Sequence, residues 1–242
     1  MDALKTDLQG CLRWFSFNEL VANPGKFKLM FLGKEMCNHI ILNINGEKIY
    51  PSDCVKLLGV HIDKFLKFDH HIKTLCSSAN KKIKCLYRIR RVLDEKQTLN
   101  LANAYVLSSF LYCPFIWMFC NKTLGSLINS VHKRLIRAVY GFNLLSLDVL
   151  LDHHNLISIH QKQLKLLMNE VYKSLNYMNP AFMKDFFLEK LMPYDLRDSD
   201  KLILPKTNSK RYGTSALHFQ MCLLWNNLPL KVKRACSYNY NY

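Results

Sequence analysis

The sequence predicts an α+β fold that is mostly α-helical. Half of its 242 residues are hydrophobic, which is enough to bury a core, whereas eight Gly and seven Pro are too few for a turn-rich all-β sandwich. One Asn-Gly dipeptide lies between apolar runs near the N-terminus, and apolar residues recur at helical spacing beyond residue 64. We therefore expect a small N-terminal β-hairpin region, followed by a helical bundle and further helices.

The first 63 residues contain the expected β-structure. Residues 2–20 have the spacing of an amphipathic helix, and Asn23-Pro24-Gly25 then interrupts the chain. We predict a strand over residues 27–32. We also predict a hairpin at Asn45-Gly46, because a type I′ turn needs positive φ at both central residues. A second strand pair is expected within residues 55–62.

A helix that separates apolar from basic residues is predicted over residues 70–93. Its apolar side chains fall within roughly 60° of one direction at ~100° per residue, and Lys82 and Arg90 lie on or beside this apolar stripe. The apolar side should dock on the protein, so that the opposite side presents cations to solvent. The cations on that side are Lys73, Lys81, Lys84, Arg88 and Arg91.

Two more helices complete the predicted bundle. Residues 95–112 form a largely uncharged helix that stops at Cys113-Pro114, and residues 123–139 form a helix that ends at Gly141. In the second of these we expect Lys133, Arg134 and Arg137 to point outward. Three consecutive helices of this kind predict an antiparallel bundle.

The remaining segments are shorter. We predict helices over residues 144–151, 164–177 and 217–225, and a short strand over residues 202–204. The last five residues, 238–242, alternate Tyr and Asn and are expected to be disordered.

The positive charge is concentrated in two segments. The formal net charge is +16, and residues 64–91 carry nine basic residues against one acidic residue, while seven basic and no acidic residues follow from position 201. Such concentrated charge favours a polyanionic partner, because cations that contact phosphates release bound counterions. The alternative is a solvated helix face and a basic tail that serve solubility alone.

Cysteine usage and hydropathy bear on the compartment. The nine Cys are scattered without a C-x-x-C pair, and no secretory signal precedes residue 20, which together predict reduced, mainly buried thiols in an intracellular protein, cytoplasmic or nuclear. Residues 97–121 lack charge over a length that could span a bilayer. Because this run contains Asn, Ser and Pro, we favour a buried bundle helix over a membrane span.

Other constellations give weaker predictions. Four residues could be considered as zinc ligands, His70, His71, Cys76 and Cys85, but they do not have the spacing of a zinc finger. The pair Cys113 and Cys120 does not have it either. No motif indicates a hydrolase, and no glycine loop that cradles phosphate is present. Three aromatic residues of an uncharged run are expected in the core rather than stacked on bases: Phe115, Trp117 and Phe119. The acidic cluster Asp195, Asp198 and Asp200 is expected to be a polar loop.

Several motifs occur in an order that resembles one family. VKLLGVHID (residues 55–63) followed by KFDHHI (67–72), then SFLYCPFIWM (109–118) and VHKRLIR (131–137), are similar to reverse transcriptases of non-LTR (LINE-type) retrotransposons. Residues 8–30 resemble the last palm helix and strand, and LWNNLP (224–229) resembles the tail of such elements. The resemblance covers residues 4–232.

The resemblance implies a division of the chain. Residues 1–63 would be a palm remnant with the primer-grip hairpin, residues 64–142 the helical thumb, and residues 143–237 a helical post-thumb region. The primer grip would be formed by Leu57, Leu58, Gly59 and Val60, and the thumb would close over an RNA or RNA–DNA hybrid duplex. The cations that would contact its phosphates are those of the two basic helix faces named above.

The chain departs from the family in its catalytic residues. RNA-directed DNA polymerases of this family hold Mg²⁺ with palm aspartates, and no Y-x-D-D motif occurs here. We therefore expect no cofactor and no polymerase activity in this chain alone, as in a truncated or decayed fragment. The alternatives are a non-catalytic helical interaction protein and, less favoured, a single-pass membrane protein.

Overall fold

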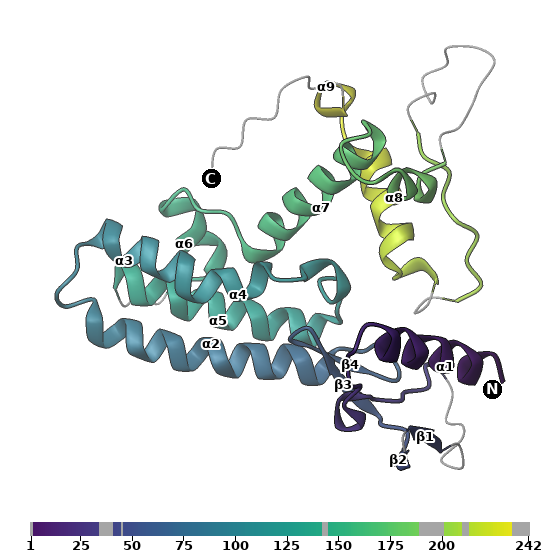
Figure 1. Cartoon of the computed structure of the whole chain (residues 1–242). Coiled ribbons are helices and arrows are strands. Elements are labelled where there is room, and N and C mark those ends of the chain that lie inside the picture. The colour runs from purple at the N-terminus through teal and green to yellow at the C-terminus, as the bar shows by residue number, and fades with distance from the viewer. Residues whose placement is uncertain are drawn as a thin grey trace, which may run out of the picture. The chain divides into compact units, whose positions relative to one another are not determined.

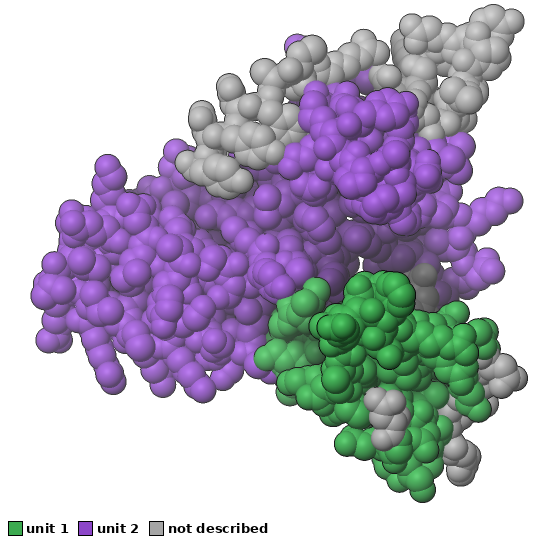
Figure 2. All heavy atoms as spheres, in the orientation of Figure 1, with its two compact units in different colours: residues 1–71 green, residues 72–242 purple. Residues whose placement is uncertain are grey.

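The chain folds into mostly helical structure with two small antiparallel hairpins, which confirms the predicted fold class (Figure 1). The computed structural model describes residues 2–33, 41–44, 46–141, 145–188, 201–209 and 213–233. Two compact units divide the chain, residues 1–71 and residues 72–242 (Figure 2). The four-part division proposed from the family resemblance stays a prediction.

The first unit carries one long helix and both hairpins. Helix α1 (Asp2–Phe17) is followed by a 3-10 turn, Pro24–Lys26. Strands β1 (Leu42–Ile44) and β2 (Glu47–Ile49) form the hairpin expected at the Asn-Gly dipeptide, with Leu42 opposite Ile49. Gly46 has a φ of 86°, as the predicted turn requires, and Asn45 lies outside the described residues.

The predicted strand over residues 27–32 is wrong. Its single β-type contact is a bridge between Leu29 and Pro51, beside which the Ser52 N–H donates to the Leu29 carbonyl at 2.8 Å. A Pro has no N–H to contribute to a ladder, so the facing segment supplies few of the hydrogen bonds that would extend this bridge. The apolar run therefore remains an irregular segment.

The second hairpin leads directly into the basic helix. Strands β3 (Cys54–Leu57) and β4 (Val60–Asp63) pair from Cys54 opposite Asp63 to Leu57 opposite Val60. The Asp63 carboxylate then accepts hydrogen bonds from the backbone N–H groups of Phe65, Lys67 and Phe68 at 2.7–3.1 Å. These bonds hold the loop that precedes α2 (Asp69–Ile89), including Phe68 at a φ of 58°.

Three helical segments of the second unit form an up-down-up bundle (Figure 1). Helix α2 is followed by α3 (Glu95–Ala102), a π-helical turn (Asn103–Leu107) and α4 (Ser108–Leu111), which together run back along it, and then by α5 (Lys122–Tyr140). Asp94 and Gln97 form a capping box at the start of α3. Helix α5 begins after the N-cap Asn121 and ends at Gly141, whose φ is 99°.

Side chains on two flanks of α2 attach it to the other bundle helices. The Lys82 ammonium donates to the Ser109 hydroxyl of α4 at 2.7 Å, and the Arg134 guanidinium of α5 donates to the Asn80 amide oxygen at 2.8 Å. Positions 80 and 82 are ~200° apart around the helix. The buried side of α2 therefore lies between two residues, Asn80 and Lys82, that hydrogen-bond to neighbouring helices.

The end of α5 is capped by a residue from the end of α2. Arg90 Nη1 donates to the carbonyls of Arg137 and Ala138 at 3.3 and 3.1 Å. The Arg137 carbonyl also accepts from the Gly141 N–H at 3.1 Å, whereas the Ala138 carbonyl belongs to the last turn, where carbonyls generally lack intrahelical partners. A cation at this end also interacts favourably with the helix dipole. Arg90 therefore belongs to the packed side of the helix, as its position beside the apolar stripe predicted.

The remaining helices pack on two apolar clusters. Helix α6 (Leu147–His153) packs on α5 through Ile136, Leu150 and Leu151. Helix α7 (Ile159–Leu175) is followed by a 3-10 segment (Ala181–Phe186), α8 (Leu217–Asn227) and α9 (Leu230–Lys233). Helices α7 and α8 contact each other along an apolar cluster. Its buried members are Met118, Leu167, Val171, Phe187, Leu202, Met221, Cys222 and Trp225.

The predicted strand over residues 202–204 is wrong. The Leu202 N–H donates to the Asn226 amide oxygen at 2.8 Å, and the Asn226 amide nitrogen donates back to the Leu202 carbonyl at 2.9 Å. Both backbone polar groups of Leu202 are thus satisfied by one side chain of α8. The segment keeps only a β-bridge at Leu202 and a hydrogen bond from the Ile203 N–H to the Leu188 carbonyl at 2.8 Å. The predicted tail, residues 238–242, lies outside the described residues.

The uncharged run 97–121 is divided among several short elements. It passes from α3 through the π-helical turn and α4 to a 3-10 turn, Pro114–Ile116, with Phe110 and Trp117 buried. Within the described residues, no helix is both long enough and apolar enough to cross a membrane.

Two adjacent arginines allow the α5 cap to be tested. Replacing Arg90 by Gln removes a charged donor from two helix-terminal carbonyls, and we expect the free energy of unfolding to fall by about 1.5 kcal/mol. Arg91→Gln removes the same charge from an exposed residue and should change the free energy of unfolding by less than about 0.5 kcal/mol. Urea denaturation of both variants measures the difference, and equal values would contradict the assignment.

Candidate nucleic-acid interface

A stripe of five exposed cations follows α2 and the turn after it. We call Lys73, Lys81, Lys84, Arg88 and Arg91 the basic stripe; all five side chains are exposed. The stripe exists because the other side of the helix is apolar and buried. The buried side chains are Ile72, Cys76, Ala79, Ile83 and Leu86.

The basic stripe is narrow and long. At ~100° per residue the four stripe positions within α2 fall within roughly 80° around the helix axis, as calculated from their spacing. From Lys73 to Arg88 the helix rises about 23 Å, since each residue adds 1.5 Å. This length corresponds to roughly seven base-pair steps at the 3.4 Å rise of a B-form duplex. The stripe therefore has the dimensions of a backbone-contacting surface.

The stripe cations are not neutralised by the described part of the protein. Among the described residues the ion pairs are Lys64 with Asp53 at 2.9 Å and Lys173 with Glu170 at 3.0 Å, and neither includes a stripe residue. Within the same ranges no hydrogen bond from a stripe side chain occurs. The ammonium and guanidinium groups are thus available to an external anion.

The cations of α5 are arranged differently from those of α2. Arg134 is exposed and lies against Asn80, at the edge of the basic stripe, so the structure brings this residue to the same surface. Lys133 and Arg137 are half-buried and thus less exposed than Arg134. The physical reason is that α5 is covered by neighbours on several sides, including α3 and α6.

The tip of the β3–β4 hairpin exposes two leucines. Leu57 is exposed, Leu58 is 81% exposed, and Gly59 follows at the turn with a φ of 89°. Val60 differs from these residues, because it is only 3% exposed. Of the four residues predicted to form the primer grip, Leu57, Leu58 and Gly59 are exposed and Val60 is buried, and their role as a grip stays a prediction.

Leu58 is held in a conformation that favours other residues. Its φ of 45° lies in the left-handed region, where an L side chain costs roughly 1–2 kcal/mol. Because Leu58 is also exposed, it is a candidate for contact with a ligand, since strained residues cluster at binding and catalytic sites.

The other sequence-predicted candidates do not converge on a site. Trp117 is 1% exposed, and Phe115 and Phe119 pack against the α7–α8 cluster, so these aromatic residues belong to the core as expected. Within the described residues, no group of three or more His, Cys, Asp or Glu side chains could hold a metal ion. The cluster Asp195, Asp198 and Asp200 lies outside the described residues.

The thiols are less buried than expected. Among the seven cysteines that the structure describes, all free, Cys76 and Cys222 are buried and the other five are exposed or half-buried. Burial raises the pKa of Cys76 to about 11, which makes this thiol a poor nucleophile. The positions outside the described residues are Cys37 and Cys236.

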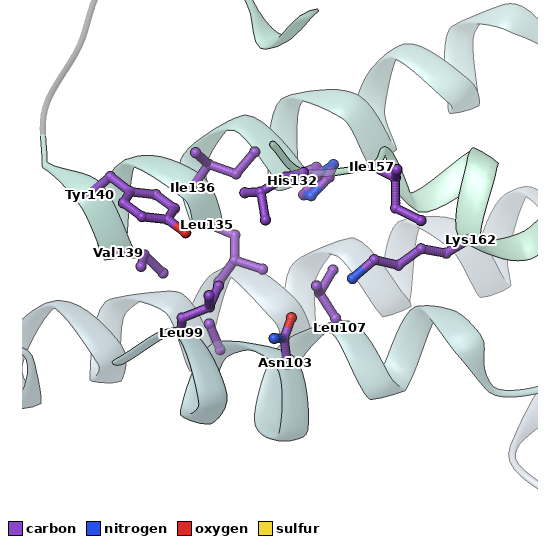
Figure 3. A pocket seen from close by; sticks show the side chains of 12 residues that line it. Leu99, Asn103, Leu107, His132, Leu135, Ile136, Val139, Tyr140, Ile157 and Lys162 are labelled. Atoms are coloured by element: carbon purple, nitrogen blue, oxygen red, sulfur yellow. The ribbon is translucent and has the colours of Figure 1, made fainter. Parts of the chain in front are cut away.

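A cavity between α3, α5 and α7 contains polar groups that the sequence analysis did not select. His132 of α5 and Lys162 of α7 line it, together with Asn103 of the π-helical turn (Figure 3). His132 follows Val131 on the buried side of α5, and a histidine within an apolar stripe is the signal that could have identified it. The π-helical turn has no comparable sequence signal, because it depends on packing.

The comparisons with known proteins give no relative. No protein-family model matches the chain, and no match to it was found among curated proteins or solved structures. The similarity to LINE-type reverse transcriptases therefore stays a hypothesis based on the motifs at residues 55–72, 109–118, 131–137 and 224–229.

Replacing Leu58 by Asn tests the strain at the hairpin tip. Asn adopts the left-handed conformation more readily than Leu, so we expect Leu58→Asn to stabilise the hairpin by about 1 kcal/mol. Leu57→Asn places the same residue in strand β3 and should give no gain. Hydrogen exchange of the β3 and β4 amides reports the local stability, and a loss in both variants would contradict the expected strain relief.

The neutral state of His132 predicts a pH dependence of stability. Burial, and secondly the charge of Lys162, lowers the pKa of His132 from 6.5 to about 4. Below pH 6.5 the unfolded chain binds a proton that the folded chain does not, so the free energy of unfolding should fall by about 3 kcal/mol between pH 6.5 and 4 from this group.

Two variants isolate this effect from other titrating groups. His132→Gln should show a smaller loss of stability between pH 6.5 and 4 than the natural chain, as measured by urea denaturation. His153→Gln changes an exposed histidine and should follow the natural chain. Identical pH profiles for the natural chain and His132→Gln would show that His132 does not titrate as described.

Proposed function

We propose that this chain binds the template–primer duplex as the thumb portion of a LINE-type reverse transcriptase. The observation that carries the proposal is the basic stripe, in which four exposed cations on one side of α2 and Arg91 in the turn after it have no counter-ion among the described residues. The motif resemblance supplies the polymerase context. The catalytic carboxylates would come from a palm that this chain does not contain.

The chemistry of the stripe favours contact with the sugar-phosphate backbone rather than with bases. Lys and Arg side chains bind phosphate oxygens in any sequence, and one negative charge occurs per ~1.7 Å of duplex axis. Reading bases would require side chains that enter a groove, and the major groove of an A-form duplex is too narrow for them. Sequence-tolerant binding of an RNA–DNA hybrid is therefore the expected activity.

The arginine of α5 extends this surface. Arg134 reaches Asn80 on α2 and remains exposed, so a second helix adds a guanidinium at the edge of the stripe. A guanidinium binds phosphate through two parallel N–H groups, which gives it more directional binding than an ammonium. The exposed leucines at the β3–β4 tip belong to the other unit and would form a separate contact.

The salt dependence of binding tests the proposal. For five cations that contact phosphates, the slope of log K against log salt should be about −4 to −5. The combined variant with Lys81, Lys84, Arg88 and Arg91 replaced by Gln should make the slope about 3 to 4 less negative and weaken binding equally across sequences. Fluorescence anisotropy with a labelled RNA–DNA hybrid of about 20 base pairs measures both.

A charge-matched control separates the stripe from net charge. The control replaces four exposed lysines on separate elements, Lys5, Lys48, Lys165 and Lys206, by Gln. It should bind nearly as the natural chain does. Equal weakening in both combined variants would mean that overall charge, not the stripe, attracts the duplex. Tighter binding of polyglutamate than of the hybrid would favour the alternative, a helical interaction protein with an acidic protein partner.

A further inference from the structure

An exposed tyrosine lies at the edge of the basic stripe. Tyr87 of α2 is 36% exposed, and it follows Lys84 by three residues, a spacing at which helical side chains are neighbours. At ~100° per residue it also lies on the same flank of α2 as Asn80, which accepts the hydrogen bond from Arg134 of α5. The tyrosine ring is therefore placed between the stripe cations and the neighbouring helix.

A cation that is itself held in place supports the Tyr87 ring. The Arg90 guanidinium lies over this ring, 5.0 Å from its centroid. The same guanidinium donates to the carbonyls of Arg137 and Ala138 at the end of α5. Because these bonds restrict the guanidinium, they also restrict the ring against which it lies. A ring restricted in this way loses little conformational entropy when a second flat group stacks on it.

A second exposed tyrosine has a similar cation but lies away from the stripe. Tyr105 of the π-helical turn is 47% exposed, and the Lys82 ammonium lies over its ring at 5.0 Å while donating to the Ser109 hydroxyl. Position 82 is at least ~100° from every stripe position within α2. Of these two tyrosines, Tyr87 alone adjoins the stripe, and Tyr105 offers a matched comparison.

An aromatic ring beside a row of cations suits nucleic acid that has unpaired bases. The cations bind backbone phosphates, and the ring stacks on a base of any identity, since every base has a π-face. Within a duplex each base is already stacked between its neighbours, so that a side chain on the surface reaches only an unpaired or terminal base. A guanidinium on the ring adds a cation–π attraction to the stack.

We propose that Tyr87 stacks on an unpaired base that adjoins the duplex bound by the basic stripe. The inference rests on the proposed function and narrows its ligand to a duplex with a single-stranded extension rather than a blunt duplex. The stack would consist of the base, the Tyr87 ring and the Arg90 guanidinium, while Lys84 and Arg88 contact phosphates of the duplex. Binding would remain tolerant of sequence, because stacking does not read the identity of the base.

The test uses the full chain and RNA–DNA hybrids that share one duplex. One hybrid is blunt, one carries an extension of a few adenosines, and one carries the same number of abasic residues, which keep the phosphates but lack the bases. In fluorescence anisotropy the adenosine extension should bind at least about fivefold tighter than the abasic extension. Equal affinity for these two, with the blunt hybrid bound, would overturn the stacking and leave the proposed function intact. Absence of binding to all of the hybrids would overturn both.

Variants of the two tyrosines assign the stacking to one ring. Tyr87→Leu should abolish the difference between the adenosine and abasic extensions, whereas Tyr87→Phe keeps the ring and should retain it. Tyr105→Leu should bind as the natural chain does. A fluorescent adenine analogue in the extension, whose emission falls on stacking, should be quenched by the natural chain and by Tyr87→Phe but not by Tyr87→Leu. An undiminished difference in Tyr87→Leu, or an equal loss in both Leu variants, would overturn the assignment. Circular dichroism shows whether each variant is folded.

Discussion

The burial of one apolar stripe on α2 determines how the rest of the basic surface is arranged. Ile72, Ile83 and Leu86 are almost completely buried, and each such side chain contributes roughly 1.5–3 kcal/mol on removal from water. Exposed ion pairs contribute about 0–1 kcal/mol each. The apolar side chains therefore set the rotation of the helix about its axis, and the cations take the solvent side as a consequence.

Two cations of α2 have a structural role that the basic stripe lacks. Lys82 and Arg90 bond to α4 and to the end of α5, whereas their sequence neighbours Lys81 and Arg91 are exposed. Adjacent residues of the same chemical type thus serve stability in one case and remain available to a ligand in the other. The net charge alone does not distinguish these roles, but the position around the helix does.

Features determined by local chemistry could be predicted from the sequence. The amphipathic pattern of α2, including the unusual positions of Lys82 and Arg90, follows from spacing, and the Asn-Gly hairpin follows from turn chemistry. The strands expected near residues 27–32 and 202–204 failed because strands need partners. Pro51 restricts pairing at the first, and in the second the Asn226 side chain occupies the backbone hydrogen-bonding groups of Leu202.

The candidate sites also divide into features that local sequence predicts and features that depend on distant parts of the chain. The basic stripe could be selected from the sequence, while Lys133 and Arg137 were expected to point outward and are half-buried. Val60 was expected in the primer grip and is buried. Covering of these residues by neighbouring elements is a long-range effect that one helix or hairpin does not encode. The cavity at His132 and Lys162 was missed for this reason, since it combines residues from three helical segments.

The π-helical turn compensates for a difference between the spacing of the buried residues and the period of an α-helix. Buried residues recur every four positions at Thr98, Ala102, Val106 and Phe110, whereas an α-helix completes a turn in 3.6 residues. In a uniform α-helix three such steps would rotate the buried side by about 120° and carry the last residue away from the core. The wider turn absorbs much of this phase drift, so a four-residue repeat stays on one side of a nearly continuous helix.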